Sequence, residues 1–248
     1  MYSNAIIWIL QVAVIVQAQV LAIVRILISC WDEKKSIQAY KVAAYGGTPG
    51  TAFYAEGSFL NDRGFRARNG NLMMYDLQGS AKWEPTVFGT LTGSVQYIDG
   101  EAGDPYNQND YAYRNSTTLR ANNRFYDYDL SYLHRFSPKS ALLLYGTYQN
   151  LLTHQREAYL LGPFGGYSYR VWDYLDVNWD YFNLQAQQQL MLGPHTVILG
   201  ADYFDGSEKV RYASVTRVSQ GGQVVGTFPY AVWLRPPERS YSVYFLDY

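Results

Sequence analysis

The chain has 248 residues, of which 17% are aromatic and only 17% charged, whereas soluble chains are nearer a quarter charged. The formal net charge of −1 leaves no basic excess for a nucleic-acid backbone, so we expect no nucleic-acid partner. Three His and a single Cys, Cys30, form neither an internal disulfide nor a cluster with zinc spacing. The sequence also has no GxxxxGK[ST] phosphate loop and no GxSxG elbow. We therefore expect a protein that is not an enzyme, with no catalytic residue, no cofactor and no metal.

Residues 1–35 are dominated by apolar side chains. Residues 5–24 contain three Gln and no charge, and Arg25 then interrupts the run. This pattern predicts an N-terminal hydrophobic helix, either a secretory signal cleaved near 16–18, a lipoprotein signal ending at Cys30, or an uncleaved spanning helix. No Lys or Arg precedes the run, which disfavours the first, and Arg25 disfavours the second. A fourth alternative is an atypical N-terminus joined directly to a barrel segment.

Residues 36–248 show the period of two that is typical of β-strands. Apolar and polar residues alternate in a series of segments: 51–60, 71–83, 88–98, 124–136, 179–192, 196–205 and 239–248. Short turns at 46–50, 84–86, 137–139 and 193–194 alternate with longer connections at 61–70, 99–121, 151–177 and 206–238. Within the last connection, Glu208–Val218 and Gln223–Trp233 flank Ser219-Gln220-Gly221-Gly222, which predicts a hairpin.

Strands of about ten residues with one apolar and one polar face, joined by short turns at one end and long loops at the other, are typical of a transmembrane β-barrel. The sequence therefore predicts an all-β fold, an antiparallel barrel of about 8–10 strands, partial or small, over residues 36–248. Such barrels lie in the bacterial outer membrane, with long loops outside the cell, here 99–121, 151–177 and 206–238. A soluble β-sandwich also has alternating strands, but it explains neither the one-sided loop lengths nor the hydrophobic N-terminus.

The alternation also assigns the faces of the barrel. The outward, lipid-side face is expected to carry Met73, Tyr75, Leu77, Leu91, Val95, Tyr128, Leu130, Tyr132, Leu199 and Ala201. The lumen is expected to receive the polar residues Asp76, Gln78, Asp127, Asp129, Gln185 and Gln187, with Thr92 and Ser94. Aromatic rings suit the membrane–water interface, and we expect five of them there: Trp83, Tyr97, Tyr126, Phe136 and Tyr203.

Three stretches resemble the barrel region of TonB-dependent outer-membrane receptors. They are YAEGSFLNDRGFRARNGNLMMYDLQGSAKWEP at 54–85, LMLGPHTVILGADYF at 190–204 and YSVYFLDY at 241–248. The first contains an Asp-Arg-Gly-aromatic-Arg loop like those that end strands in that family, and Tyr241, Tyr244 and Asp247 of the last fit a recurrent strand pattern. The resemblance implies a barrel for uptake of a scarce nutrient, such as a siderophore-like chelate or cobalamin.

The sequence departs from the family in its N-terminal part and in its strand number. The family has a plug domain and a segment that TonB grips, whereas only 1–35 precede the first expected strand, and its barrels have 22 strands. We therefore expect a fragment-like barrel, not transport-competent alone, with unpaired edges near 36–45 and 240–248. Its expected partners are outer-membrane lipid, the barrel-assembly machinery, and TonB only if another chain supplies a plug.

Two alternatives stay open. A small complete outer-membrane channel or surface-binding barrel is favoured by Tyr244, Leu246 and Tyr248, whose alternation resembles a terminal assembly signal. A barrel enzyme would need a His paired with a carboxylate at one rim, and only His154 with Glu157 offers that. Asp99, Glu101, Asp104 and Asp110 make loop 99–121 acidic, but their spacing fits no calcium loop.

Overall fold

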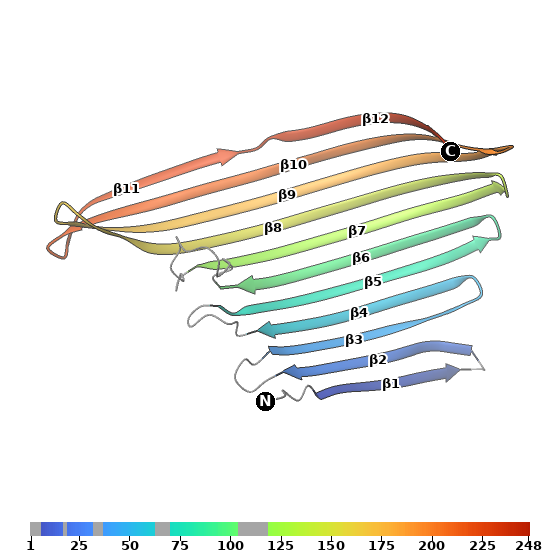
Figure 1. Ribbon diagram of the computed structural model, residues 1–248, viewed down its shortest axis with the longest axis horizontal. Coiled ribbons are helices and arrows are strands. Elements are labelled where there is room, and N and C mark those ends of the chain that lie inside the picture. The colour runs from blue at the N-terminus through green and yellow to red at the C-terminus, as the bar shows by residue number, and fades with distance from the viewer. Residues whose placement is uncertain (1–5, 17–18, 32–36, 63–69, 104–118) are drawn as a thin grey trace.

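The computed structural model describes residues 6–16, 19–31, 37–62, 70–103 and 119–248. These residues form one antiparallel 12-stranded sheet without a helix, in the order β1-β2-β3-β4-β5-β6-β7-β8-β9-β10-β11, with β12 also paired to β10 (Figure 1). The strands are β1 (Ile6–Val16), β2 (Gln19–Trp31), β3 (Ile37–Thr48), β4 (Thr51–Asp62), β5 (Leu72–Thr86), β6 (Gly89–Ala102), β7 (Arg120–Ser137), β8 (Ser140–Phe164), β9 (Tyr167–Leu192), β10 (His195–Gln220), β11 (Gln223–Leu234) and β12 (Pro237–Asp247). Within the described ranges, no helix is long and apolar enough to span a membrane.

The expected N-terminal helix is not supported, because the described residues 6–16 and 19–31 are strands. β1 and β2 form an antiparallel hairpin that pairs Ile6 with Cys30, and β2 continues into the sheet by pairing Ile23 with Tyr45 of β3. Both strands are rich in Ile and Val, whose branched side chains lose rotamer freedom in a helix and suit a pleated sheet. Periodicity alone does not distinguish a continuous apolar run in a strand from one in a helix. The expected cleavage site at 16–18 falls mostly outside the described residues.

Four two-residue turns join strands at one end of the sheet. Their flanking pairs are Thr48↔Thr51, Thr86↔Gly89, Ser137↔Ser140 and Leu192↔His195. Three of these turns lie where the sequence predicts them. The fourth lies at Val87-Phe88 instead of 84–86, because Thr86 Oγ1 accepts the backbone N–H groups of Phe88 and Gly89, at 3.3 and 3.0 Å.

At the other end, β8, β9 and β10 are much longer than expected, with 25, 26 and 26 residues. The predicted loops 151–177 and 206–238 are therefore mostly strand, which corrects the sequence reading. The predicted hairpin is confirmed, since β10 and β11 pair from Val210↔Leu234 to Gln220↔Gln223. Gly221 and Gly222 take φ of 58° and 84° at its tip, as a tight hairpin turn requires. Of the predicted loop 99–121, residues 104–118 lie outside the described residues.

One long edge of the sheet is shared by two strands. β11 pairs with Val210–Gln220 of β10 and β12 with Val197–Ser207, so the two lie end to end along β10. Arg235 and Pro236 lie between them and Pro237 begins β12, and proline cannot donate to a ladder. The opposite edge is β1, and among the described residues no ladder joins β1 to β11 or β12. The edge expected near 240–248 is found in β12. Of the edge expected near 36–45, the described residues 37–45 lie in β3, between β2 and β4.

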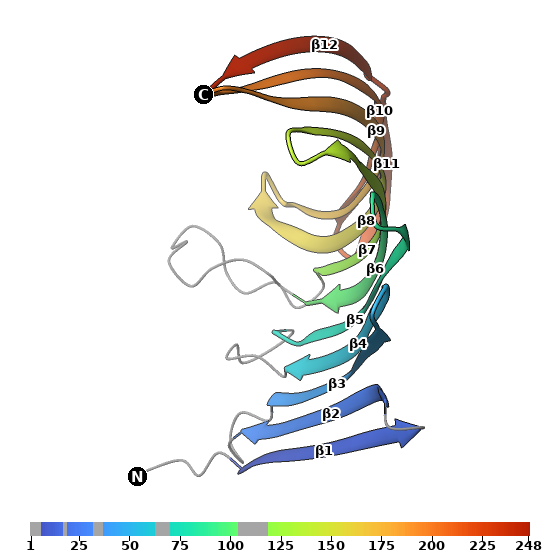
Figure 2. The same ribbon diagram turned by 90° about the vertical axis from the view of Figure 1, so that its right-hand side faces the viewer.

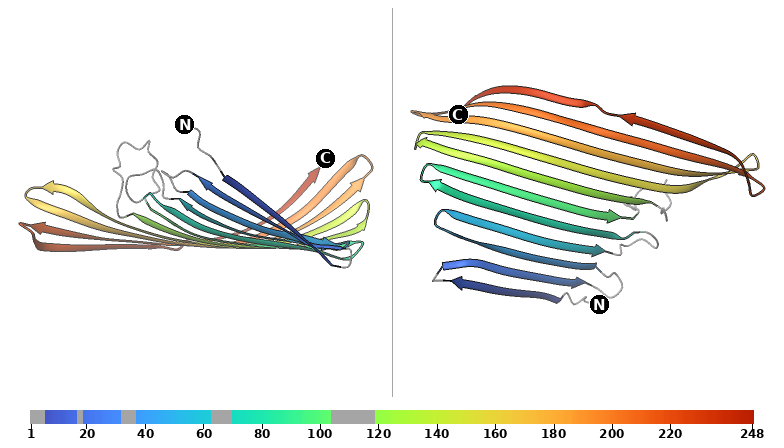
Figure 3. Two further views of the ribbon diagram at one scale, coloured as in Figure 1. Left: turned by 90° about the horizontal axis from the view of Figure 1, so that it is seen from below. Right: turned by 180° about the vertical axis from the view of Figure 1, so that it is seen from behind.

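The sheet is a single curved layer. Figures 2 and 3 show its strands bending toward the side that faces the reader in Figure 1. Few apolar side chains are buried in the described part of the chain: Leu119, Ala121, Val171 and Val218. Because none of the described residues forms a second layer against the sheet, its apolar face needs an apolar medium or partner to cover it.

Candidate functional site

The pairing register divides the side chains of the sheet into two faces. Residues directly opposite each other in a ladder point to the same face, so Leu77, Tyr97 and Tyr126 share one face through consecutive pairs. Gln96 pairs with both Gln78 and Asp127 on the other face. Followed strand by strand, the register places all ten residues of the expected lipid-side set on the first face, and Asp76, Gln78, Thr92, Ser94, Asp127, Asp129, Gln185 and Gln187 on the second.

The backbone hydrogen bonds identify which face is concave. Thr196 and Tyr248 exchange N–H···O bonds of 3.0 and 3.1 Å, so even-numbered residues of β10 direct their backbone groups toward β12. In Figure 1, β10 runs from right to left and β12 lies above it. For L-residues in a strand of this direction, backbone groups that face β12 imply side chains that point toward the reader. Figures 2 and 3 show that this side is concave. The polar set therefore lies on the concave face and the apolar set on the convex face.

An aromatic girdle crosses the convex face near the loop end. Its rings touch along neighbouring strands, with centroid distances of 6.1 Å for Tyr40–Phe59, 4.9 Å for Phe59–Tyr75, 5.0 Å for Tyr97–Tyr126, 6.2 Å for Tyr128–Tyr148, 6.5 Å for Phe182–Tyr203 and 5.1 Å for Tyr203–Tyr241. Three of the expected interface aromatics, Tyr97, Tyr126 and Tyr203, belong to this girdle. The other two, Trp83 and Phe136, lie at the short-turn end and are 54% and 57% exposed.

Each of three girdle tyrosines donates its hydroxyl to a carboxylate on the loop side. The distances from hydroxyl oxygen to carboxylate oxygen are 3.1 Å for Tyr97 and Asp99, 2.9 Å for Tyr203 and Asp205, and 3.2 Å for Tyr148 and Asp180. A cation on the next strand pairs with each carboxylate: Arg124 with Asp99 at 3.7 Å, Arg239 with Asp205 at 3.0 Å and Lys209 with Asp180 at 3.3 Å. The convex face thus changes from apolar to ionic within two residues of the girdle.

The apolar band between the two aromatic edges has a height that fits a membrane. On β5, Tyr75 and Trp83 bound a convex run of Leu77, Gly79 and Ala81. Eight residues extend about 27 Å along the strand. If the strand is tilted as in known barrels, this corresponds to roughly 20 Å along the membrane normal. The apolar band of outer-membrane barrels is about 25 Å tall.

The concave face carries a cross-strand polar network. Its bonds join Lys41 to Glu56 (2.5 Å), Gln78 to Glu56 (3.1 Å), Gln96 to Asp76 (3.1 Å), Ser94 and Tyr145 to Asp129 (3.0 and 2.7 Å), Thr147 to Asp127 (3.3 Å), Gln185 to Tyr244 (3.0 Å) and Ser242 to Asp202 (2.9 Å). Five of the six expected lumen residues take part, and Gln187 lies on the same face opposite Leu143 and Gly200. Sequence reasoning did not single out Glu56, Tyr145 and Asp202, whose partners depend on the register.

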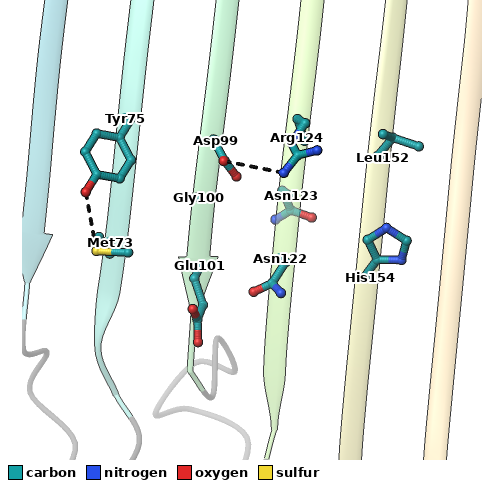
Figure 4. A pocket seen from close by; sticks show the side chains of 10 residues that line it. All are labelled: Met73, Tyr75, Asp99, Gly100, Glu101, Asn122, Asn123, Arg124, Leu152 and His154. Atoms are coloured by element: carbon teal, nitrogen blue, oxygen red, sulfur yellow. Dashed lines mark hydrogen bonds and ion pairs between the residues drawn. The ribbon is translucent and has the colours of Figure 1, made fainter.

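A cavity of about 260 Å³ opens on the convex face beyond the girdle (Figure 4). Figure 4 shows Asp99 beside Arg124 and His154 on the strand beyond them. His154 does not meet Glu157, because three positions apart on one strand they point to opposite faces. Its ring instead lies 2.9 Å from Asp176. The described residues contain no group of His, Cys, Asp and Glu that could hold a metal ion, and Asp104 and Asp110 lie outside them.

Comparison with known proteins gives a likeness of fold. No family model matches the chain, and no curated protein matches it. The crystal structure of the ferric citrate transporter FecA in the unliganded form matches with a TM-score of 0.54 at 16% sequence identity. The match covers 86% of this chain but only 38% of that one. The chain therefore has an antiparallel all-β fold like part of that transporter, and spans well under half of its length.

Proposed function

We propose that this chain forms part of a transmembrane β-barrel in the bacterial outer membrane, of the TonB-dependent receptor type that takes up a scarce nutrient. The observation that carries the proposal is the division of one single-layer sheet into an apolar convex face between two aromatic edges and a polar concave face. The likeness to a ferric citrate transporter supports the uptake role.

Lipid accounts for the convex face better than water does. Leu77, Leu130 and Val243 are 52%, 58% and 87% exposed at mid-strand, and each large apolar side chain gains about 1.5–3 kcal/mol when it leaves water. A one-layer sheet has no second layer against which to bury these side chains, so the gain must come from another medium. In a bilayer, however, bare edges at β1 and β11–β12 would cost several kcal/mol for each unpaired backbone group, so the proposal also requires that further strands pair with them.

The concave face suits a water-filled or plugged lumen. Its carboxylates and amides are bonded to one another across strands, as polar groups in a barrel interior are. A ferric chelate or another polar nutrient would meet hydrogen-bonding groups along this face. Coupling to TonB would need a plug, and we expect no accumulation of nutrient by cells that express this chain alone.

The location is tested by impermeant cysteine labelling in a Cys30→Ser background. Phe164→Cys, at the β8–β9 tip, and Val87→Cys, in a short turn, are 79% and 86% exposed and serve as matched positions. In intact cells, a membrane-impermeant maleimide should label residue 164 and reach residue 87 only after the outer membrane is opened. Equal labelling of both, or a chain that fractionates away from the outer membrane, would refute the proposed topology.

Transport is tested separately, with labelled ferric citrate and cobalamin. Cells that carry only this gene should show no uptake against a gradient, with or without TonB. TonB-dependent accumulation would show that the chain works as a complete receptor or recruits a plug. Passive, TonB-independent leakage would instead favour the small outer-membrane channel.

A further inference from the structure

An apolar groove of about 700 Å³ lies across β7–β10 and β12 on the convex face. Its floor is made by the small residues Gly146, Ala186 and Ala201, which are cross-strand neighbours or diagonal neighbours. Leucine and valine side chains stand around this floor, and three tyrosines line its ends: Leu130, Leu144, Leu184, Val243, Tyr132, Tyr203 and Tyr241. The groove is thus open and apolar, with the width of several strands.

A second groove, of about 530 Å³, lies farther along the same strands, beyond the girdle. Lys209, Arg211 and Arg235 line it together with Trp233. The Arg211 guanidinium lies over the Trp233 ring, 4.8 Å from its centroid, which holds the cation in place. Two carboxylates partly neutralise these cations: Asp176 lies 3.9 Å from Arg211, and Asp180 lies 3.3 Å from Lys209.

Charge is segregated between the faces in this part of β8–β12. The convex face carries Arg156, Arg170, Lys209, Arg211, Arg217 and Arg239 against Asp176, Asp180 and Asp205. The concave face of β8–β10 carries Glu157, Asp173 and Glu208, with neither Arg nor Lys among the described side chains. On β10, six residues, or about 20 Å of strand, separate Tyr203 of the apolar groove from Lys209 of the basic groove. A basic excess at this distance on the same face is complementary to the anionic head of an amphiphile whose acyl chains lie in the apolar groove.

We propose that the convex face of β8–β10 binds one phosphate-bearing lipid, with its acyl chains in the groove floored by Gly146, Ala186 and Ala201 and its phosphate at Lys209, Arg211 and Arg235. The inference rests on the proposed function, because it takes this face to be the one that lipid covers. Arg pairs phosphate through two parallel N–H···O bonds. The long Lys209 side chain can also reach down toward the girdle while its stem covers apolar surface.

The test measures binding to the purified full chain in non-ionic detergent, so it does not depend on cellular location. Native mass spectrometry would compare dioleoyl phosphatidic acid with dioleoylglycerol, which has the tails alone, and with inorganic phosphate, which has the head alone. We expect phosphatidic acid to bind at least about tenfold more tightly than either. Inorganic phosphate binding as tightly would reveal a plain anion site, and dioleoylglycerol binding as tightly would reveal non-specific adsorption. Either result overturns the proposal.

Matched variants separate the head site from the tail site. The affinity for phosphatidic acid should fall at least about tenfold in the triple variant Lys209→Gln/Arg211→Gln/Arg235→Gln. It should stay unchanged in the control variant Lys82→Gln/Arg135→Gln/Lys139→Gln, whose substitutions lie at the short-turn end. Ala186→Leu/Ala201→Leu should fill the groove and reduce binding, whereas Val95→Leu, on the convex face of β6, should not. Equal losses in test and control variants would overturn the site.

Salt dependence of the unmodified chain keeps the proposal falsifiable if a variant fails to fold. Surface charge interactions are screened over about 10 Å at 0.1 M salt and about 3 Å at 1 M. Phosphatidic acid binding should therefore fall severalfold across that range, and binding that stays constant would contradict the role of the three cations. A normal salt response with failed outer-membrane labelling would refute the proposed location while leaving the lipid site intact.

Discussion

The hydroxyl of Tyr203 and the guanidinium of Arg239 meet the same oxygen, Oδ2 of Asp205, at 2.9 and 3.0 Å. Tyr97, Asp99 and Arg124 repeat this arrangement on β6 and β7, at 3.1 and 3.7 Å. In each case the tyrosine ring stays within the aromatic girdle while its hydroxyl faces the ionic side. The unit Tyr-x-Asp with a cross-strand Arg therefore marks the loop-side boundary of the apolar band at two places.

Breaking this unit should loosen the attachment of edge strand β12. Asp205→Asn weakens both bonds to the carboxylate, and because the groups are partly exposed we expect a loss of about 1 kcal/mol in the free energy of unfolding. Urea titration in lipid vesicles measures it, and a double-mutant cycle of Tyr203→Phe with Arg239→Gln should show coupling. Strictly additive single effects would mean that the two partners act independently.

Beyond the girdle, Asp173 of β9 links the extended strands β8, β9 and β10 through side-chain hydrogen bonds. This carboxylate accepts the hydroxyls of Tyr159 on β8 and Tyr212 on β10, both at 3.0 Å. Burial, followed by this bond and the negative charge of Asp173, raises the pKa of Tyr159 to about 12. A tyrosine whose pKa is raised by folding contributes stability that is complete below its ordinary value near 10 and is lost as pH rises toward 12.

We therefore expect the extension to open in alkaline solution, between about pH 10 and 12. A fluorophore at Val225→Cys, in the Cys30→Ser background, would report the transition near the β10–β11 tip. Burial and the hydrogen bond to Asp173 also raise the pKa of Tyr212. Tyr159→Phe should therefore remove part of the pH dependence, because phenylalanine cannot ionise, whereas Tyr174→Phe, on the convex face, should keep it. A transition that persists unchanged in Tyr159→Phe would assign it to another group.

The faces of β4–β10 could be predicted from the sequence because one apolar and one polar face impose a period of two on each strand. The lengths of β8–β10 could not, since beyond the girdle both faces carry polar side chains. His154 and Glu157, or Asp173 and Asp176, are then polar on opposite faces, and the apolar-polar contrast that indicates a strand disappears. The segment resembles a loop although it is fully paired.

The candidate site divides in a similar way. Tyr97-Ile98-Asp99 and Tyr203-Phe204-Asp205 are visible in the sequence as tyrosine and aspartate two positions apart, which places them on one face of any strand. Their partners Arg124 and Arg239 become predictable only once the register of neighbouring strands is known. The N-terminal strands β1 and β2 were missed for a different reason, because an apolar run without alternation fits a helix and a strand equally.

A charge on the convex face should cost far more than the same charge on the neighbouring concave position. Leu130→Arg places a guanidinium at mid-band on the apolar side of β7 and should lower the free energy of unfolding in vesicles by about 2–4 kcal/mol. Ser131→Arg, one residue along, points to the polar face beside Thr92 and Tyr145 and should cost under about 1 kcal/mol. Equal penalties at 130 and 131 would contradict the assignment of the two faces.

Gly200 should tolerate no side chain, because the ring of Tyr244 lies over it. A Cβ on Gly200 would overlap the Tyr244 ring, and moving that ring would break the 3.0 Å hydrogen bond from Gln185 to the Tyr244 hydroxyl. Gly200→Val should therefore destabilise the pairing of β12 with β10 by about 1–3 kcal/mol. Gly93→Val serves as the control, because its nearest contacts are 3.7 and 3.8 Å away. Proteolysis of the β12 edge reports the difference, and edge protection that is equal in the two variants would show that the Tyr244 ring can move aside without loosening the strand.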